Sequence, residues 1–314
     1  MAIGCIAALS AHADDSYPTK VIRIINPYAA GGGSDVLARL LSQDMSAYLK
    51  QPIIIENRPG ASGLIGSNAV IHAAPDGYTL LFTSSSALVG ALVKSPHPFD
   101  PIEAFSAVGR AVEYPLYVVI NPKIPANNLR EFADYARAQP KPLFHTSIGI
   151  GSTGHLACEQ LAMAGGFKLD YVPYTSVPAS LQSVMSNQTQ LMCDSVGGSQ
   201  QYVSEGKLKG LAVMGKSRLP QVPNVPTTAE AGFPNAEGGV WLGLLAPKGT
   251  PAPILQKLNK ALQLALSTPE MASRAQREAW TIIKETPDEA DVAIAKDMKQ
   301  WAEIIQIKQI KVSD

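Results

Sequence analysis

The stretch Val21-Ile22-Arg23-Ile24-Ile25-Asn26-Pro27-Tyr28-Ala29-Ala30-Gly31-Gly32-Gly33-Ser34-Asp35 has a counterpart near the middle of the chain, Leu143-Phe144-His145-Thr146-Ser147-Ile148-Gly149-Ile150-Gly151-Ser152-Thr153-Gly154. In both, an apolar strand leads into a glycine-rich turn with small hydroxyl side chains and then into a helix. Each turn places backbone N–H groups at a helix N-terminus, where partial positive charge and unpaired donors favour an anion. Two such turns, about a domain's length apart, predict two lobes that hold one small acid between them.

Strand-like and helical segments alternate from residue 21 to about residue 214. Strands are expected at 21–26, 52–57, 78–84, 115–121, 143–148, 170–174, 189–194 and 208–214. The first helix is expected at 34–49, with Ser34 as its N-cap and apolar residues at helical spacing behind it. Near-continuous apolar strands between helices predict an α/β protein whose sheets are mostly parallel and flanked by helices.

Two segments are expected to carry the chain from one lobe to the other. The first lies at 121–125, after an apolar strand, and the second is the proline-dense segment 220–226. Beyond it, a strand-like run at 240–245 and three helical segments, the last at about 287–307, are expected to return to the first lobe. The domain prediction is therefore a discontinuous lobe 1 (14–120 and 226–314) and a lobe 2 (121–225), with the ligand cleft between them.

Composition narrows the class of protein. The chain has 314 residues, of which 46% are hydrophobic and 17% charged, as in a globular protein of two ordinary domains. Its formal net charge is zero, and its aromatic residues, 6% of the total, do not interleave with basic ones. These features argue against a nucleic-acid partner and against binding to an anionic membrane surface.

The N-terminal segment has the features of a leader. The apolar run that starts at Met1 ends in Ala11-His12-Ala13, the small-x-small form of a signal-peptidase site. A basic start is missing, as in a shortened leader. Residues 1–13 are therefore predicted to be a signal peptide, and the mature protein is predicted to be secreted.

The strongest alternative is an NAD-dependent oxidoreductase, because Gly149-x-Gly151-x-x-Gly154 follows a predicted strand and opens a helix. The acid that binds ribose should lie at the carboxyl end of the next strand, beside the phosphate loop. Asp170 instead begins the next strand, at the far end of the sheet. This position favours the receptor interpretation over the dinucleotide one.

Other catalytic and metal patterns are weak. Ile150 stands where a nucleophile elbow around Ser152 would need its first glycine, and His155 is expected to cap or pack rather than act as a base. The five histidines are not paired at metal spacing in the sequence. Cys158 and Cys193 are expected on a helix and a neighbouring strand, where a disulfide is permitted but two unpaired core cysteines are favoured. We therefore expect no catalytic residues, no metal and no cofactor.

Six ordered motifs carry a family resemblance, from about residue 17 to the C-terminus. They are Pro27 to Arg39, Glu56-Asn57-Arg58-Pro59-Gly60-Ala61-Ser62-Gly63, Ala74-Pro75-Asp76-Gly77-Tyr78-Thr79-Leu80, Val172-Pro173-Tyr174, Pro226-Thr227-Thr228-Ala229-Glu230-Ala231-Gly232 and Leu245-Ala246-Pro247-Lys248-Gly249-Thr250-Pro251. Together they resemble the Bug family, the periplasmic solute receptors of tripartite tricarboxylate transporters.

The resemblance implies a two-lobed periplasmic-binding-protein fold of type II-like form. It also implies capture of a small organic acid, a dicarboxylate or an aromatic carboxylate, partly through ordered water, and its delivery to a separate membrane permease. A monomer is expected, because an exposed cleft must dock reversibly. The ligand-binding residues that it implies are Tyr28, Ala29, Ala30, Gly32, Gly33, Ser34, Ser84, Ser85, Ser147, Gly149, Gly151, Ser152, Thr153, Tyr174, Asp194 and Ser195.

One departure from the family pattern concerns the ligand. Val172-Pro173-Tyr174 is usually followed by Lys-Gly in the family, whereas this chain has Thr175-Ser176. The change removes a cation near the expected cleft, so the groups that meet the far end of the ligand are expected to differ.

Overall fold

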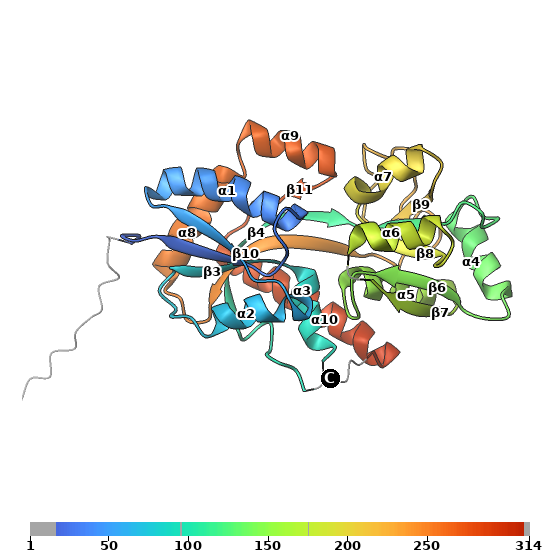
Figure 1. Ribbon diagram of the computed structural model, residues 1–314, viewed down its shortest axis with the longest axis horizontal. Helices are drawn as coiled ribbons and strands as arrows, with labels where there is room; N and C mark the ends of the chain where they lie inside the picture. The colour runs from blue at the N-terminus through green and yellow to red at the C-terminus, as the bar shows by residue number, and fades with distance from the viewer. Residues whose placement is uncertain (1–16, 95, 175, 311–314) are drawn as a thin grey trace, which may run out of the picture.

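The computed structural model describes residues 17–94, 96–174 and 176–310, so the predicted signal peptide lies outside the described residues. The described strands form two sheets, which occupy the two halves of the molecule (Figure 1). The first sheet has the order β11 (Thr281–Ile282), β4 (Phe105–Pro115), β10 (Gly239–Pro247), β3 (Thr79–Ser84), β1 (Ile22–Asn26), β2 (Ile53–Asn57). The second has the order β7 (Leu169–Pro173), β6 (Leu143–Ser147), β8 (Leu191–Asp194), β5 (Tyr117–Ile120), β9 (Lys209–Val213).

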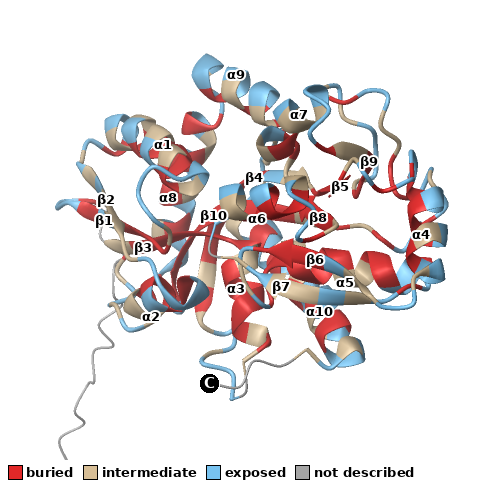
Figure 2. Ribbon diagram, turned by 45° about the vertical axis from the view of Figure 1, so that its right-hand side comes forward, coloured by how far each residue is buried: buried red, intermediate tan, exposed pale blue. Residues whose placement is uncertain are grey.

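Helices flank both sheets and turn their buried residues toward the strands (Figure 2). The first half contains α1 (Gly33–Leu49), a short 3₁₀ turn (Ala61–Gly63), α2 (Leu64–Ile71), α3 (Ser85–Leu92), α8 (Ala252–Ala265), α9 (Pro269–Glu278) and α10 (Pro287–Lys308). The second contains α4 (Leu129–Ala138), α5 (Thr153–Gly165), α6 (Val177–Met185) and α7 (Val196–Ser204). None of the described helices is long and apolar enough to cross a membrane.

Strand direction brings the ends of both sheets together. β1, β2, β3 and β4 run the same way, and β10 is inserted antiparallel between β3 and β4. In the second sheet β6, β7, β8 and β9 run the same way, and β5 is inserted antiparallel between β8 and β9. The expected α/β architecture with mostly parallel strands is confirmed, and the carboxyl ends of these eight strands all face the junction between the sheets.

The position of the first crossing differs from the sequence prediction. β5, assigned to lobe 1, pairs in the second sheet, with Tyr117 opposite Asp194 on one side and Val213 on the other. The chain leaves the first sheet at the end of β4, after Pro115, and not at 121–125 as predicted. The sequence pattern had not revealed β4. Arg110 interrupts its apolar pattern, and this side chain is neutralised inside the fold by Glu285, at 2.8 Å between Nη2 and Oε2.

Hydrogen bonds join the segments that pass between the sheets. The Leu116 N–H donates to the Gly238 carbonyl at 2.9 Å, and the Leu116 carbonyl accepts from the Met214 N–H at 2.7 Å. The Gly238 N–H donates to the Met214 carbonyl at 2.9 Å. The outgoing segment at Leu116 and the two ends of the returning segment are thus held side by side.

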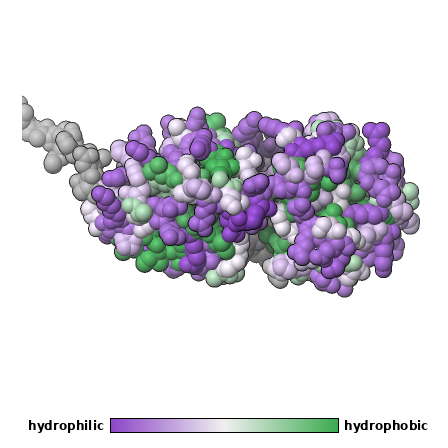
Figure 3. Space-filling view, turned by 90° about the horizontal axis from the view of Figure 1, so that it is seen from above, coloured by the Kyte–Doolittle hydropathy of each residue, from purple (hydrophilic) through white to green (hydrophobic). Residues whose placement is uncertain are grey.

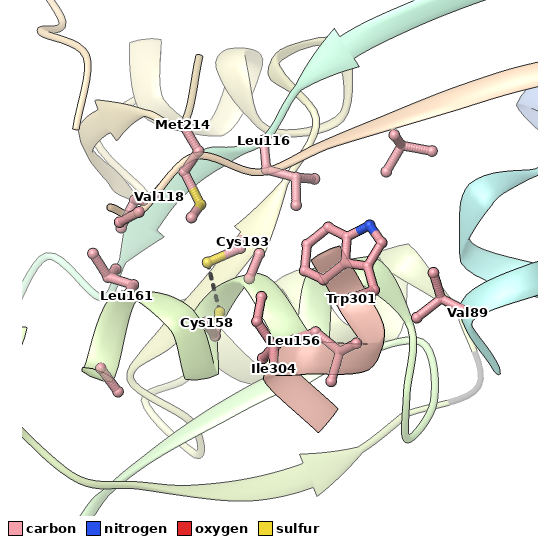
Figure 4. Close-up of a cluster of buried hydrophobic side chains, with 14 of the residues drawn as sticks. Val89, Leu116, Val118, Leu156, Cys158, Leu161, Cys193, Met214, Trp301 and Ile304 are labelled. Atoms are coloured by element: carbon pink, nitrogen blue, oxygen red, sulfur yellow. Dashed lines mark hydrogen bonds between the residues drawn. The ribbon is translucent and has the colours of Figure 1, made fainter. Parts of the chain in front are cut away.

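The last helix contacts both halves of the molecule. Trp301 and Ile304 of α10 lie beside Leu156 and Cys158 of α5 in one continuous core cluster (Figure 4). Near the end of α10, Lys308 Nζ lies 2.9 Å from Glu159 Oε2. The expected return of the C-terminal segment to the first half is therefore incomplete, because α10 also packs against the second.

We expect Trp301→Ala to lower the free energy of unfolding by about 3–5 kcal/mol, the usual cost of removing a buried large aromatic side chain. Trp301 is only 1% exposed, whereas Val292 of the same helix is 71% exposed. Val292→Ala is therefore the matched control and should leave the unfolding midpoint in urea nearly unchanged. Equal midpoints for the two variants would contradict a structural role for α10 between the two halves.

Candidate functional site

The first loop, residues 28–34, connects β1 to α1 and is shaped by Asp35 and Asn57. Asp35 Oδ2 accepts the Gly31 N–H at 2.9 Å and is 3.0 Å from Arg39 Nε. Asn57 Nδ2 donates both to the Tyr28 carbonyl at 3.1 Å and to Asp35 Oδ1 at 2.9 Å. Burial alone raises the pKa of Asp35, but hydrogen bonds from Arg39, Gly31 and Asn57 outweigh it and lower this pKa to about 2. The carboxylate therefore stays charged and fixes the loop.

The N-terminus of α1 is left open. Its N-cap is Gly32 rather than the expected Ser34, and no side chain caps it. Ser34 lies inside the first turn, where its Oγ donates to Asn26 Oδ1 at 3.1 Å. Among the described residues, the N–H groups of Gly33, Ser34 and Asp35 have no acceptor. Ala29, Ala30, Gly32 and Gly33 are exposed, so a solute can reach these donors.

The N-terminus of α3 lies at the end of the neighbouring strand β3 and is also uncapped by a side chain. The structure brings two predicted residues together here, since the Tyr28 and Ser84 hydroxyls are 2.5 Å apart. Ser85 does not join them. It is fully buried, and its Oγ accepts the Trp241 N–H at 3.4 Å, so it points into the core.

The second loop, residues 147–153, is largely satisfied by its own lobe. Ser147 Oγ lies 2.7 Å from Ser152 Oγ and 3.0 Å from the Tyr171 hydroxyl. The Gly149 N–H donates to that same hydroxyl at 3.1 Å, and the Gly151 N–H donates to His155 Nδ1 at 2.9 Å. The N–H groups of Gly149 and Gly151 therefore already have acceptors, the Tyr171 hydroxyl and His155 Nδ1.

His155 holds the second loop as a neutral acceptor. Burial lowers its pKa to about 3, with a smaller contribution from the positive charge of His145. Its ring stacks on Tyr171 at 4.0 Å between centroids. The expectation that His155 caps or packs is confirmed by these contacts.

His145 is the charged member of the same cluster. Its Nε2 lies 3.1 Å from Glu159 Oε1. Burial lowers the pKa of His145, but Cys158 and Glu159 raise it to about 9. His145, His155 and Glu159 lie close enough together to hold a metal, which their sequence spacing did not indicate. His155 Nδ1 accepts the Gly151 N–H and His145 Nε2 faces Glu159, so the cluster positions the second loop, while His145 Nδ1 is buried without a hydrogen-bond partner.

The second loop also touches the first half of the molecule. The Thr153 N–H donates to Ser86 Oγ of α3 at 3.3 Å. Gly151 has a φ of +78°, and a Cβ at this position would lie 2.3 Å from Val93 Cγ2. Glycine at 151 is thus required by contact with Val93, directly after α3, and by its backbone conformation. On the other side of the junction, a Cβ at Gly197 would lie 2.7 Å from Glu278 Oε2, so α7 also approaches α9.

The remaining predicted residues bond mainly within the second half. Asp194 Oδ2 accepts from Ser199 Oγ at 2.5 Å, and burial raises the pKa of Asp194 to about 6. Ser195 Oγ accepts the Gly198 N–H at 3.1 Å and caps α7. The Tyr174 hydroxyl donates to Gln188 Oε1 at 3.3 Å. Asp194 also acts electrostatically on a group from the first half.

That group is Tyr114, which the sequence analysis missed. It is the second-to-last residue of β4, just before the chain crosses at Leu116. Burial raises the pKa of Tyr114, and electrostatic interactions with Asp194, Tyr28 and Glu278 raise it further. An aromatic residue at the carboxyl end of a strand is the signal that could have identified it, but β4 itself had not been recognised.

The dinucleotide alternative does not match the geometry. Asp170 pairs with Phe144 at the start of β7, while Ser147, at the edge of the loop, pairs with Pro173 at its end. The acid is therefore at the opposite end of the strand from the glycine loop, as the sequence indicated.

Comparison with known proteins gives a consistent result. Residues 37–310 match the family described as the tripartite tricarboxylate transporter family receptor. The chain is 30% identical to Protein BugT of Bordetella pertussis over 305 residues, which is 96% of this chain and 93% of that protein. The periplasmic binding protein BugD is 31% identical with a TM-score of 0.81, covering 94% of this chain and 99% of BugD. MatC (Rpa3494) from Rhodopseudomonas palustris, solved with bound malate, is 31% identical with a TM-score of 0.81, covering 92% of this chain and 100% of MatC.

The two histidines predict opposite effects of pH on stability. In the protein with both cysteines reduced, the folded pKa of His145 is raised from 6.5 to about 9, so its contribution is full below pH 6.5 and lost as the pH rises toward 9. The folded pKa of His155 is lowered from 6.5 to about 3, so its contribution is full above pH 6.5 and lost as the pH falls toward 3.

The wild-type protein should lose stability above pH 6.5 through His145 and below pH 6.5 through His155. We expect His145→Gln to abolish the first loss and His155→Gln the second, measured as wild-type-minus-variant free energies of unfolding. A His155 difference that grows toward alkaline pH would overturn the neutral assignment.

Proposed function

Because the chain belongs to the tripartite tricarboxylate transporter receptor family, we propose that it captures a small organic acid between its two halves and delivers it to a separate membrane permease. The family is one of substrate-binding receptors and not of enzymes. The oxidoreductase alternative is therefore set aside, in agreement with the position of Asp170.

The observation that carries the proposal is the pair of helix N-termini without side-chain caps in the first half, of which that of α1 is exposed. α1 and α3 begin at the carboxyl ends of adjacent strands, and neither has a side-chain cap. Ligands of such sheets bind beyond the carboxyl ends of the strands. Unpaired N–H groups and the helix dipole favour a carboxylate there without any lysine or arginine, and neither loop contains one.

The two halves contribute unequally in this proposal. In the second loop, Gly149, Gly151 and Thr153 already donate to protein acceptors. We therefore propose that the first half binds the carboxylate, through Tyr28, Gly33 and neighbouring donors, and that the second loop mainly covers it. Tyr114 and Asp194 are proposed to meet the far end of the ligand.

The domain boundaries follow the sheets in this proposal. Lobe 1 would comprise the first sheet with its helices, and lobe 2 the second sheet with its helices. The crossings would lie at Leu116 and between Met214 and Gly238, where the three hydrogen bonds join them. In the space-filling view the molecule narrows between the two halves, and hydrophilic side chains gather there (Figure 3).

The ligand class and cellular setting are drawn from the relatives. MatC was solved with malate, and BugD is described as a periplasmic binding protein. We propose a dicarboxylate or an aromatic carboxylate as ligand, the periplasm as location and a monomer as the free form. The permease is proposed from the family description, since a receptor cannot move solute by itself.

We expect a thermal-shift screen of ligand-free, refolded protein to respond to carboxylates such as malate, succinate and benzoate. A ligand at one hundred times its dissociation constant adds about 2.7 kcal/mol of stability. Because about 1 kcal/mol moves the midpoint of a domain of this class by roughly 2–4 °C, a shift of several degrees is expected. Responses to neutral sugars and amides, with none to acids, would overturn the proposal.

A single backbone donor can be removed at Gly33. Proline is favoured at the first position of a helix and lacks the N–H, and Gly32 has φ −73° and ψ 165°, which suit a residue before proline. No atom lies within 4 Å of a Cβ at Gly33. Gly33→Pro should therefore weaken binding of a responding carboxylate about tenfold to a hundredfold, the value of one hydrogen bond to a charged group.

Gly33→Ala is the matched control, because it adds the same Cβ but keeps the N–H. Calorimetry should give nearly wild-type affinity for it, and ligand-free melting temperatures should agree for all three proteins. Equal affinities of the proline and alanine variants would show that the α1 N-terminus does not hold the anion.

A further inference from the structure

Cys158 and Cys193 meet inside the second half of the molecule. Cys158 lies on α5 and Cys193 on β8, and their sulfur atoms are 2.6 Å apart (Figure 4). A disulfide bond is about 2.05 Å long, so the two sulfurs lie within about half an ångström of bonding distance. The sequence pattern had favoured two unpaired core cysteines, but it could not show that the side chains point at one another.

His145 is the polar side chain that interacts with Cys158, and the other neighbours named here are apolar. Cys158 is 0% and Cys193 2% exposed, and Leu116, Leu161 and Met214 lie in the same apolar cluster. The group of metal-type side chains found among the described residues lies beside this pair but includes neither cysteine. Two thiols in such a place gain little as hydrogen-bonding groups, since S–H is a weak donor and sulfur a weak acceptor.

The position of the pair gives it structural significance. α5 begins directly after the second loop, and β8 ends at Asp194 and leads into the Ser195 cap of α7. A bond between Cys158 and Cys193 would therefore join α5, which follows the second loop, to β8, which ends at the predicted ligand residues Asp194 and Ser195. It would also close a loop of the chain that contains β7 and α6, which restricts the unfolded chain.

We propose that Cys158 and Cys193 form a disulfide bond in the mature protein. Two S–H bonds break and one S–S bond forms, with release of two protons and two electrons. The oxidant is a disulfide, which takes up the two electrons and two protons by thiol–disulfide exchange and becomes two thiols. Burial raises the pKa of the Cys158 thiol, which suppresses the reactive thiolate in the folded protein. The bond therefore forms while the chain is still open, and it resists reduction afterwards.

Peptide mapping tests the proposal directly. The full chain is refolded in a mixture of reduced and oxidised glutathione, then denatured with excess iodoacetamide and digested without reductant. We expect a cross-linked peptide pair that contains Cys158 and Cys193, lighter by two hydrogen atoms than the sum of the reduced peptides. Alkylation of both residues, or pairing of either one with Cys5 or glutathione, would overturn the proposal.

A second measurement does not depend on ligand binding or on the cellular location. The unfolding midpoint of the oxidised protein should fall by several degrees when a strong reductant is present during unfolding. The double variant Cys158→Ala, Cys193→Ala is the matched control, and its midpoint should not respond to the reductant. A wild-type midpoint that is equally insensitive would count against a covalent link, and the peptide map remains decisive if the double variant fails to fold.

Discussion

The hydrogen bonds among Leu116, Met214 and Gly238 fix how the two halves of this protein relate to each other. They hold the outgoing and returning segments side by side, so β5 must enter the second sheet, and β10 the first, against the direction of the strands already there. The other long strands of both sheets then point their carboxyl ends at the junction. Both glycine loops and the N-termini of α1, α3, α5 and α7 arrive at one place as a consequence.

The two glycine loops have similar sequences but differ in which of their backbone N–H groups have acceptors. In the first loop, Asp35 uses the Gly31 N–H to set the backbone and leaves the first turn of α1 unpaired. In the second loop, Tyr171 and His155 accept hydrogen bonds from the Gly149 and Gly151 N–H groups. The resulting rigid surface contacts α3. Unpaired donors of an anion site cost free energy when no ligand is bound. A single such site, covered by the rigid second loop, therefore suits a receptor that must also release its ligand.

The sequence was most informative where local chemistry decides the structure. The apolar strands, the glycine turns and the amphipathic helix at 287–307 were predicted with small errors at their ends. β4 was missed because Arg110 reads as a solvated residue until Glu285, far away in the sequence, is placed against it. The occupied donors at Gly149 and Gly151 were missed for a similar reason. Their acceptors lie on β7 and within α5, and only the folded chain brings them back to the loop.

The helix α10, which packs on both halves through Trp301 and Lys308, has a kinetic consequence. Separating the halves would break or shear these contacts, which therefore stabilise the compact arrangement of the empty protein. A binding-competent state that is already well populated costs the ligand little of its intrinsic affinity. The same contacts would slow both the entry and the escape of the solute. A bound solute would therefore stay in the receptor for longer.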